Sequence, residues 1–328
     1  MHNSADIRRD NRKRIYRLLL DGRAYTKQQV AAGTGLSVAT CNTLLNEMLA
    51  RGVVAGESQR TGEVGRSSML YRIDDAHERY LAVSFRMDGE CRVITCSVLS
   101  ALGREEMRRV ERMECLDAEQ IIRLIGEMLA VQERIARILV APPGITEQGV
   151  IRYGDVPELE NVPLQELLER AFDLPVTMEN DMHCMAYGYS RRMNRPEEVI
   201  TLACYPTHLL PGTATIHKGM IIQGAHGIAG MAGFLPCGMS REEQLRELEP
   251  GRCIPYVARS LSAIMVLLNP GVIVLTGDLI EPDMLEEVRR ICAEDIPEEY
   301  MPKFVMTDSF EEYLQAGLFA LAVDNKII

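Results

Sequence analysis

A short run of small polar residues between positions 37 and 46 has the composition of a helix face that can touch DNA bases. Hydroxyl and amide groups on this face donate and accept hydrogen bonds, and side chains this short let a helix enter the major groove. The apolar residues of the segment recur at three-and-four spacing and predict a buried stripe of Val38, Cys41, Leu44, Leu45, Met48 and Leu49. The candidate DNA-contacting residues, with Val38 in both sets, are Ser37, Val38, Ala39, Thr40, Asn42 and Thr43.

The residues before this segment predict a shorter helix and a sharp turn. Thr26 and Gln29 have the spacing of a capping box at a helix start. Gly33 and Gly35 allow the positive φ values that a tight turn requires. Ser37 is then a favourable N-cap for the second helix, which Gly52 closes. Two short helices joined in this way predict a helix-turn-helix over residues 26–51.

The flanking residues predict a winged helix. Upstream, Ile15, Leu18 and Leu19 give a first helix its buried stripe, and its surface is rich in arginine. Downstream, residues 53–55 and 69–73 have the composition of two strands around a glycine-rich tip. Arg60 and Arg66 on this tip are expected to contact the phosphate backbone or the minor groove. The alternative is a small helical module that binds protein instead of DNA.

Charge is distributed unevenly along the chain of 328 residues, whose formal net charge is -11. Residues 1–77 hold 12 Lys and Arg against 8 Asp and Glu, whereas the remainder holds 24 against 39. Nucleic acid is therefore expected to bind only through the basic front end.

Length and composition indicate a globular protein of two or three domains. Nine cysteines without a C-x-x-C pair, and an N-terminus unlike a signal peptide, predict a reducing cytoplasm. The longest uncharged run, residues 260–277, is broken by Asn269-Pro270-Gly271 and predicts a helix followed by a buried strand, not a membrane span.

Strands and helices alternate beyond residue 78, which predicts an α/β architecture with two halves and a cleft between them. The expected strands are residues 80–85, 92–99, 138–141, 199–204, 220–223 and 272–276. The expected helices are residues 118–134, 164–172, 181–192, 254–268, 282–292 and 310–323.

Five features in this order resemble the ROK family (repressors, open reading frames, kinases), in its transcriptional-regulator branch. They are the N-terminal winged helix with its tip at 62–66, Pro142-Pro143-Gly144, the segment 174–181, the glycine loop 224–230 and the segment 269–277. The resemblance implies a two-lobed, actin-like (ribonuclease H-like) ATPase-type fold behind the winged helix, with a sugar site in the cleft and a dimer or tetramer as the working form. It implies domains at 1–77, 78–192 and 193–328, with the C-terminal helix returning to the first lobe.

The phosphate-binding turns of the family's sugar kinases are not retained. The first, Asp-x-Gly-x-Thr, is replaced by Ser84-Phe85-Arg86-Met87-Asp88, although Asp88-Gly89 can form an ordinary hairpin. The second, Gly-Thr-Gly-x-Gly, falls in residues 205–213 and keeps one glycine. Backbone N–H groups of glycine-rich turns hold nucleotide phosphates, so we expect no ATP binding and no cofactor.

The sugar and zinc motifs of the family are altered as well. Asn180-Asp181 matches the family's sugar-binding pair, and a dipole-stabilised carboxylate at a helix start is the alternative role of Asp181. Met231 and Phe234 replace the acid and the histidine of Glu-x-Gly-His, and a familiar hexose would thereby lose charge-assisted bonds of about 1.5 to 3 kcal/mol each. His226 in the glycine loop is a further ligand candidate. Cys237-Gly238 alone remains of the zinc loop, so no metal is expected.

Together these patterns predict a cytoplasmic transcriptional regulator, a repressor, with a catalytically inactive ROK-like domain. Its expected partners are a double-stranded DNA operator, further copies of itself and a small-molecule effector other than a standard hexose, with no membrane partner. Two alternatives stay open: a sugar kinase of the same family, and a DNA-binding dimer without an effector.

Overall fold

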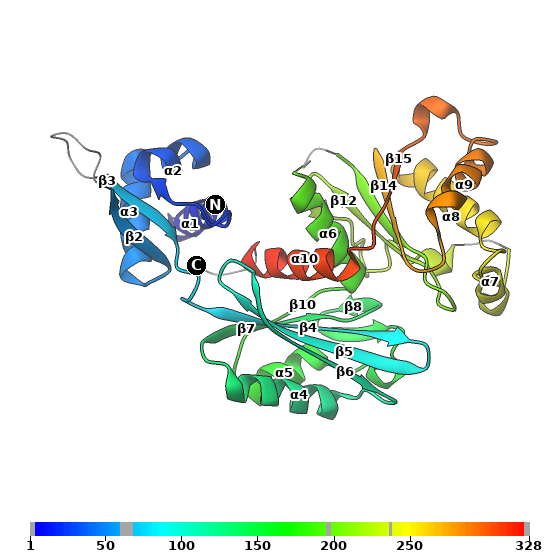
Figure 1. The fold of residues 1–328 in the computed structure, drawn as a ribbon, viewed down its shortest axis with the longest axis horizontal. Helices are drawn as coiled ribbons and strands as arrows, with labels where there is room; N and C mark the ends of the chain where they lie inside the picture. Colours follow the sequence, from blue (N-terminus) through cyan, green and yellow to red (C-terminus); the bar gives the residue numbers. More distant parts are fainter. Residues whose placement is uncertain (1–3, 60–67, 195–197, 236–237, 325–328) are drawn as a thin grey trace.

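The computed structural model describes residues 4–59, 68–194, 198–235 and 238–324. It has a small N-terminal domain, drawn in blue in Figure 1, and two α/β lobes with the C-terminal helix between them. Within the described residues, no helix is both long and apolar enough to cross a membrane.

The N-terminal domain is a winged helix. Three helices pack on a small antiparallel sheet of strand order β1-β3-β2, and their buried side chains form one core. The domain consists of α1 (Ser4–Leu19), β1 (Tyr25–Thr26), α2 (Lys27–Thr34), α3 (Val38–Ala50), β2 (Val54–Gln59) and β3 (Ser68–Ile73).

Local signals in the sequence explain where α2 and α3 begin and end. The capping box of Thr26 and Gln29 is present, and Ser37 caps α3, as predicted. Gly35 ends α2 with φ +71°, whereas the prediction for Gly33 was wrong, because Gly33 is part of α2 and has no positive φ. Val38 was wrongly placed on the buried stripe: it lies in the first turn of α3, beyond the core, and is 50% exposed.

The first lobe is built on a five-stranded sheet of order β10-β7-β4-β5-β6, in which β4, β7 and β10 are parallel and β5 and β6 are antiparallel to their neighbours. Alternate residues of its strands face α4 and α5 on one side and α10 (Phe310–Asp324) on the other. Its elements are β4 (Arg79–Asp88), β5 (Cys91–Ser100), β6 (Glu105–Met113), α4 (Ala118–Val131), β7 (Ile135–Ala141), the hairpin β8 (Ile145–Glu147) and β9 (Val150–Tyr153), α5 (Leu164–Phe172) and β10 (Val176–Met178).

The second lobe repeats this topology. Its sheet has the order β13-β12-β11-β14-β15, again with three parallel strands and two antiparallel ones, which is the duplicated arrangement of an actin-like fold. Helices α8 and α9 cover its outer face. Helix α6 (Asp181–Met193) precedes this lobe and packs against its strands β11 and β12, whereas α10 follows it in the chain. The other elements are β11 (Ile200–Cys204), β12 (Gly212–His217), β13 (Met220–Ile221), α7 (Arg241–Glu247), α8 (Ile254–Leu268), β14 (Val272–Thr276), α9 (Leu285–Cys292) and β15 (Lys303–Met306).

Most of the expected elements are present, and the differences lie at ends and in short strands. The predicted helix over 118–134 ends at Val131, the predicted strand over 220–223 ends at Ile221, and the predicted helix over 282–292 starts as a 3₁₀ turn. Four strands of the two large sheets were not expected from the sequence, namely β6, β10, β12 and β15. Strand β6 has a charged sequence because it lies at the edge of its sheet and is largely exposed.

Helices α6 and α10 cross at very close range between the lobes. A Cβ atom on Gly317 of α10 would lie 1.7 Å from the Cys184 carbonyl oxygen, and one on Gly188 of α6 would lie 2.0 Å from that of Tyr313. Only glycine allows the two backbones to approach this closely. The pair therefore packs as one unit, and α10 also contacts β4 and β7 of the first lobe.

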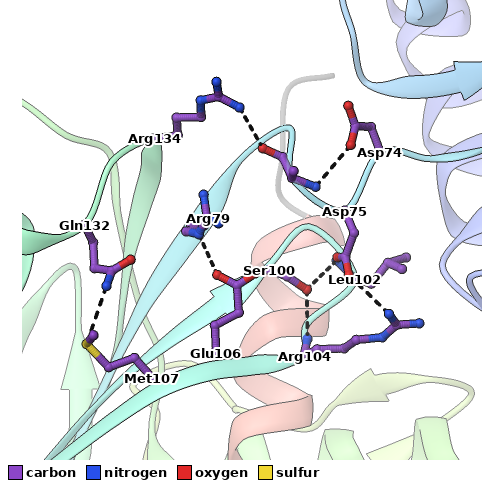
Figure 2. A network of polar contacts seen from close by, with 11 residues as sticks. Asp74, Asp75, Arg79, Ser100, Leu102, Arg104, Glu106, Met107, Gln132 and Arg134 are labelled. Carbon is purple, nitrogen blue, oxygen red and sulfur yellow. Dashed lines mark hydrogen bonds and ion pairs between the residues drawn. The ribbon is translucent and has the colours of Figure 1, made fainter.

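The winged helix is attached to the first lobe by a hydrogen-bonded linker after β3. Figure 2 shows Asp75 of this linker facing the loop between β5 and β6. The Asp75 carboxylate accepts a hydrogen bond from the Leu102 main-chain N–H at 2.9 Å and pairs with Arg104 at 3.3 Å. In addition, the buried Tyr16 hydroxyl of α1 donates to the Ala101 carbonyl at 3.1 Å.

Candidate nucleic-acid interface and ligand cleft

The first turns of α3 present most of the candidate DNA-contacting residues to solvent. Ser37, Val38, Ala39 and Thr43 are exposed, and Thr40 and Asn42 are partly exposed. The Ser37 hydroxyl accepts a hydrogen bond from the Thr40 main-chain N–H at 3.1 Å and lies 2.8 Å from the Thr40 hydroxyl. The structure therefore brings six of the predicted residues together on one surface of one helix.

Asn42 has a second role that the sequence did not reveal. Its side-chain carbonyl accepts a hydrogen bond from Lys27 Nζ, which also lies 5.5 Å from the centre of the Tyr71 ring. Asn42 thereby joins α3 to the start of α2 through Lys27. Arg60 and Arg66, the predicted wing contacts, lie outside the residues that the structure describes.

A second site lies in a cleft of about 340 Å³ between the lobes, lined by residues of both. Asn180 caps α6 at its edge: its side-chain oxygen accepts from the His183 main-chain N–H at 3.0 Å, and its amide nitrogen donates to the Gly144 carbonyl. Gly144 has φ +99°, and a Cβ atom there would lie 2.1 Å from the Tyr153 carbonyl oxygen. Asn180 and Gly144, which both belong to the segments that resemble the family, thus stabilise the local backbone conformation.

The carboxylates of Asp155 and Asp181 both line the cleft. Asp181, in the first turn of α6, accepts a hydrogen bond from the Met182 main-chain N–H at 2.7 Å. Burial, together with the negative charge of Asp155, raises the pKa of Asp181 to about 7. Burial also raises the pKa of Asp155. Asp181 is thus both a helix-start carboxylate and a residue that lines the cleft.

Another part of the cleft lining is aromatic and cationic. Met231 and Phe234, two of the ligand-site candidates, line the cleft. The Phe234 ring lies 5.5 Å from the Tyr153 ring, and the Arg241 guanidinium stacks on both, at 4.5 and 4.8 Å. Such stacking stabilises a cation while leaving its N–H groups available to a ligand.

His226 lies apart from this group. It is exposed, 3.5 Å from a Glu147 carboxylate oxygen, and lines a neighbouring polar cavity that shares Asn180 and His183 with the cleft. In that cavity Glu179 accepts from Gln223 at 2.7 Å and lies 2.8 Å from His183 Nδ1. The Glu179–Gln223 bond joins the first lobe's β10–α6 connection to the second lobe.

The two segments that the sequence analysis compared with phosphate-binding turns lie at the end of a strand and in the cleft lining. Residues 84–88 continue β4, paired with β5 up to Asp88 opposite Cys91, so the chain turns at Gly89, as predicted for an ordinary hairpin. In the second segment, Leu209, Leu210 and Pro211 line the cleft. Among the described residues, no group of three or more His, Cys, Asp or Glu side chains is placed to hold a metal ion; Cys237 lies outside them.

Sequence reasoning missed Tyr153, Asp155 and Arg241 as cleft residues. Tyr153 lies at the end of the β8–β9 hairpin, Asp155 lies in the loop after it, and Arg241 begins α7. Their only signal in the sequence is a charged or aromatic residue beside a turn or an N-cap. Such a signal does not show that distant turns meet in space.

The fold and the two sites define a winged helix joined to a two-lobed, actin-like domain. The ROK family model matches residues 94–254, and a model described as winged helix-turn-helix DNA-binding matches residues 8–55. The chain therefore carries a ROK family domain behind a winged helix-turn-helix domain.

Individual relatives agree with this organisation. The xylose repressor of Caldicellulosiruptor bescii is 21% identical over 243 residues, which cover 71% of this chain and 60% of that protein. The chain thus matches less than two thirds of that repressor's length. The crystal structure of a ROK family transcriptional regulator, a homolog of the E. coli MLC protein, has a TM-score of 0.70 at 16% identity and covers 98% of this chain and 100% of that one.

A ROK family glucokinase from Streptomyces griseus, solved with glucose and AMPPNP, has a TM-score of 0.58 at 14% identity and covers 75% of this chain and 100% of that one. The fold of the two lobes is therefore shared by regulators and kinases.

Proposed function

We propose that this protein is a DNA-binding transcriptional regulator that acts as a repressor. The observation that carries the proposal is the complete helix-turn-helix: both helices are capped, Gly35 makes the turn, and the polar face of α3 is open to solvent. The similarity to a xylose repressor supports the same conclusion. In this proposal α3 enters the major groove, and Ser37, Thr40 and Thr43 are its contact residues.

We further propose that the ROK domain, residues 78–328 in two lobes divided near 192, serves as a ligand sensor and dimerisation domain without kinase activity. Support comes from the two segments that the sequence analysis compared with phosphate-binding turns. Residues 84–88 belong to the continuous strand β4, and Leu209, Leu210 and Pro211 occupy the second segment. A sugar kinase is the second candidate, favoured by the fold shared with a glucokinase. Binding of ATP distinguishes the two.

The effector that we propose for the cleft is not a standard hexose. Met231 and Phe234 offer no charged acceptor, and the stacked Arg241 makes this wall apolar and cationic. The acidic wall of Asp155 and Asp181 remains for one polar edge of the ligand.

Selection of genomic DNA fragments by the purified full-length chain tests the proposed function. A dimer is expected to enrich a pseudo-palindromic site whose halves are separated by one helical turn, about 34 Å, because two recognition helices then reach successive major grooves. Failure to enrich any site at moderate salt would contradict the proposal.

A further inference from the structure

One carboxylate near the C-terminus joins helices of two domains. Asp324 lies in the last turn of α10. Its main-chain carbonyl accepts a hydrogen bond from Lys13 Nζ at 2.9 Å, and its Oδ1 accepts one from Arg17 Nε at 2.6 Å. Tyr187 of α6 donates its hydroxyl to Oδ2 of the same carboxylate. Helix α1 of the winged helix is thereby tied to both α6 and α10.

The surroundings of Asp324 favour this junction. Its side chain is only 16% exposed, so the ion pair with Arg17 is partly shielded from solvent. Two cations of α1 also lie at the C-terminal end of α10, where the helix dipole favours positive charge. Burial and the bond to Asp324 raise the pKa of Tyr187 to about 12.

The junction is one of several contacts that the described residues of the winged helix make with the ROK domain. Other contacts are the linker at Asp75, which Figure 2 shows, and the bond to the Ala101 carbonyl from Tyr16, the neighbour of Arg17 on α1. A domain held only by its linker can rotate about it, whereas contacts made by α1 as well restrict that rotation. Figure 1 shows the end of α10 directed toward the blue domain.

Helix α6 extends from the junction to the ligand cleft. Its first turn holds Asn180 and Asp181 at the cleft, and Tyr187 follows less than two turns later. Next to Tyr187, Gly188 lies at the close crossing with α10. A displacement of α6 at the cleft therefore moves the Tyr187 hydroxyl, and with it the contact on Asp324.

We propose that Asp324 is a positioning residue: it fixes the orientation of the winged helix on the ROK domain and makes that orientation depend on helix α6. This proposal concerns regulation and rests on the proposed function. It assigns Asp324 no contact with DNA or with the effector. Its consequence is that the spacing of the two recognition helices in a dimer depends on the junction.

Amide hydrogen exchange of the full-length chain tests the junction without any DNA. Asp324→Ala and Arg17→Gln are each expected to raise exchange in the second half of α1 and the last turn of α10 by about tenfold, with α4 and α8 unchanged. The double variant should be no worse than Asp324→Ala alone, because the ion pair with Arg17 is already lost in that variant. Glu166→Ala, which removes the ion pair with Arg170 within α5, is the control and should leave α1 unchanged. Unchanged exchange in α1, or additive effects of the two changes, would overturn the proposal.

Affinity for the selected operator and for its isolated half-site tests the consequence. Asp324→Ala should bind the full site about tenfold more weakly and the half-site as the wild type does, because the recognition helix is intact and only the pairing of two domains is lost. Equal loss on both DNAs, or no loss, would contradict the positioning role. If the wild type selects no DNA, the proposed function fails, and the hydrogen-exchange result still decides the junction.

Discussion

The winged helix and the ligand cleft keep their family features in different ways. In the winged helix, the caps and the turn are intact and the polar face of α3, which includes the capping residue Ser37, stays open to solvent. In the cleft, Asn180 and Gly144 are present but hydrogen-bond to each other and to the start of α6. A residue of a family motif can therefore stabilise the fold, whether or not it also contacts a ligand.

The largest effect on stability is expected at the close crossing of helices α6 and α10. Gly317→Ala at the α6–α10 crossing should destabilise the protein by more than about 3 kcal/mol, because its Cβ atom would collide with the Cys184 carbonyl. Denaturant unfolding measures this. Gly126→Ala, in the interior of α4 with its nearest contact at 3.6 Å, is the matched control and should stabilise by about 0.5 to 1 kcal/mol. Similar results for the two variants would show that the crossing is loose.

The next prediction concerns the cost in stability of burying the Asp181 carboxylate. Its pKa of about 7 in the folded protein lies above its unfolded value, so the folded state binds more protons between about pH 4 and 7, and stability falls as pH rises through this range. Asp181→Asn removes this loss and should be more stable than the wild type by about 2 kcal/mol at pH 8, with a smaller difference at pH 5. Urea unfolding at both pH values is the measurement. A difference independent of pH would contradict the electrostatic account of the cleft.

A smaller effect is expected at the start of the recognition helix. Ser37→Ala should cost about 1 kcal/mol of stability, since the N-cap hydroxyl accepts the Thr40 N–H. Thermal unfolding should show this loss, and Ser37→Asp should restore most of it. An unchanged melting temperature for the alanine variant would mean that α3 is held by its packing alone.

Neither ATP nor a standard hexose is expected to bind to the protein. ATP with magnesium should give no heat in calorimetry, and millimolar glucose or N-acetylglucosamine should not raise the melting temperature. A ligand at 100 times its dissociation constant would add about 2.7 kcal/mol, which a thermal shift detects readily. A shift with an ordinary hexose that Asp181→Ala abolishes would identify a conventional sugar-responsive regulator. Micromolar binding of ATP would favour the kinase.

The sequence predicts well those features that depend on near neighbours in the chain. The caps at Thr26 and Ser37, the hairpin at Gly89 and the helices at 164–172 and 254–268 each follow from residues within one element. Features that join distant segments were not predictable: Asn42 with Lys27, Arg241 with Tyr153 and Phe234, and Asp324 with α1. Val38 shows the limit within a helix, because three-and-four spacing does not reveal where the core ends.

The most direct test of the central claim is the affinity of the full-length chain for its selected operator and for scrambled DNA of the same length and salt concentration. A sequence-specific regulator should prefer the operator by about a thousandfold or more. Thr40→Ala should reduce this preference by about 1 to 3 kcal/mol if Thr40 reads a base, with scrambled-DNA affinity unchanged. Glu166→Ala on α5 should behave as the wild type. Equal affinity of the wild type for both DNAs would contradict the claim that α3 reads DNA sequence.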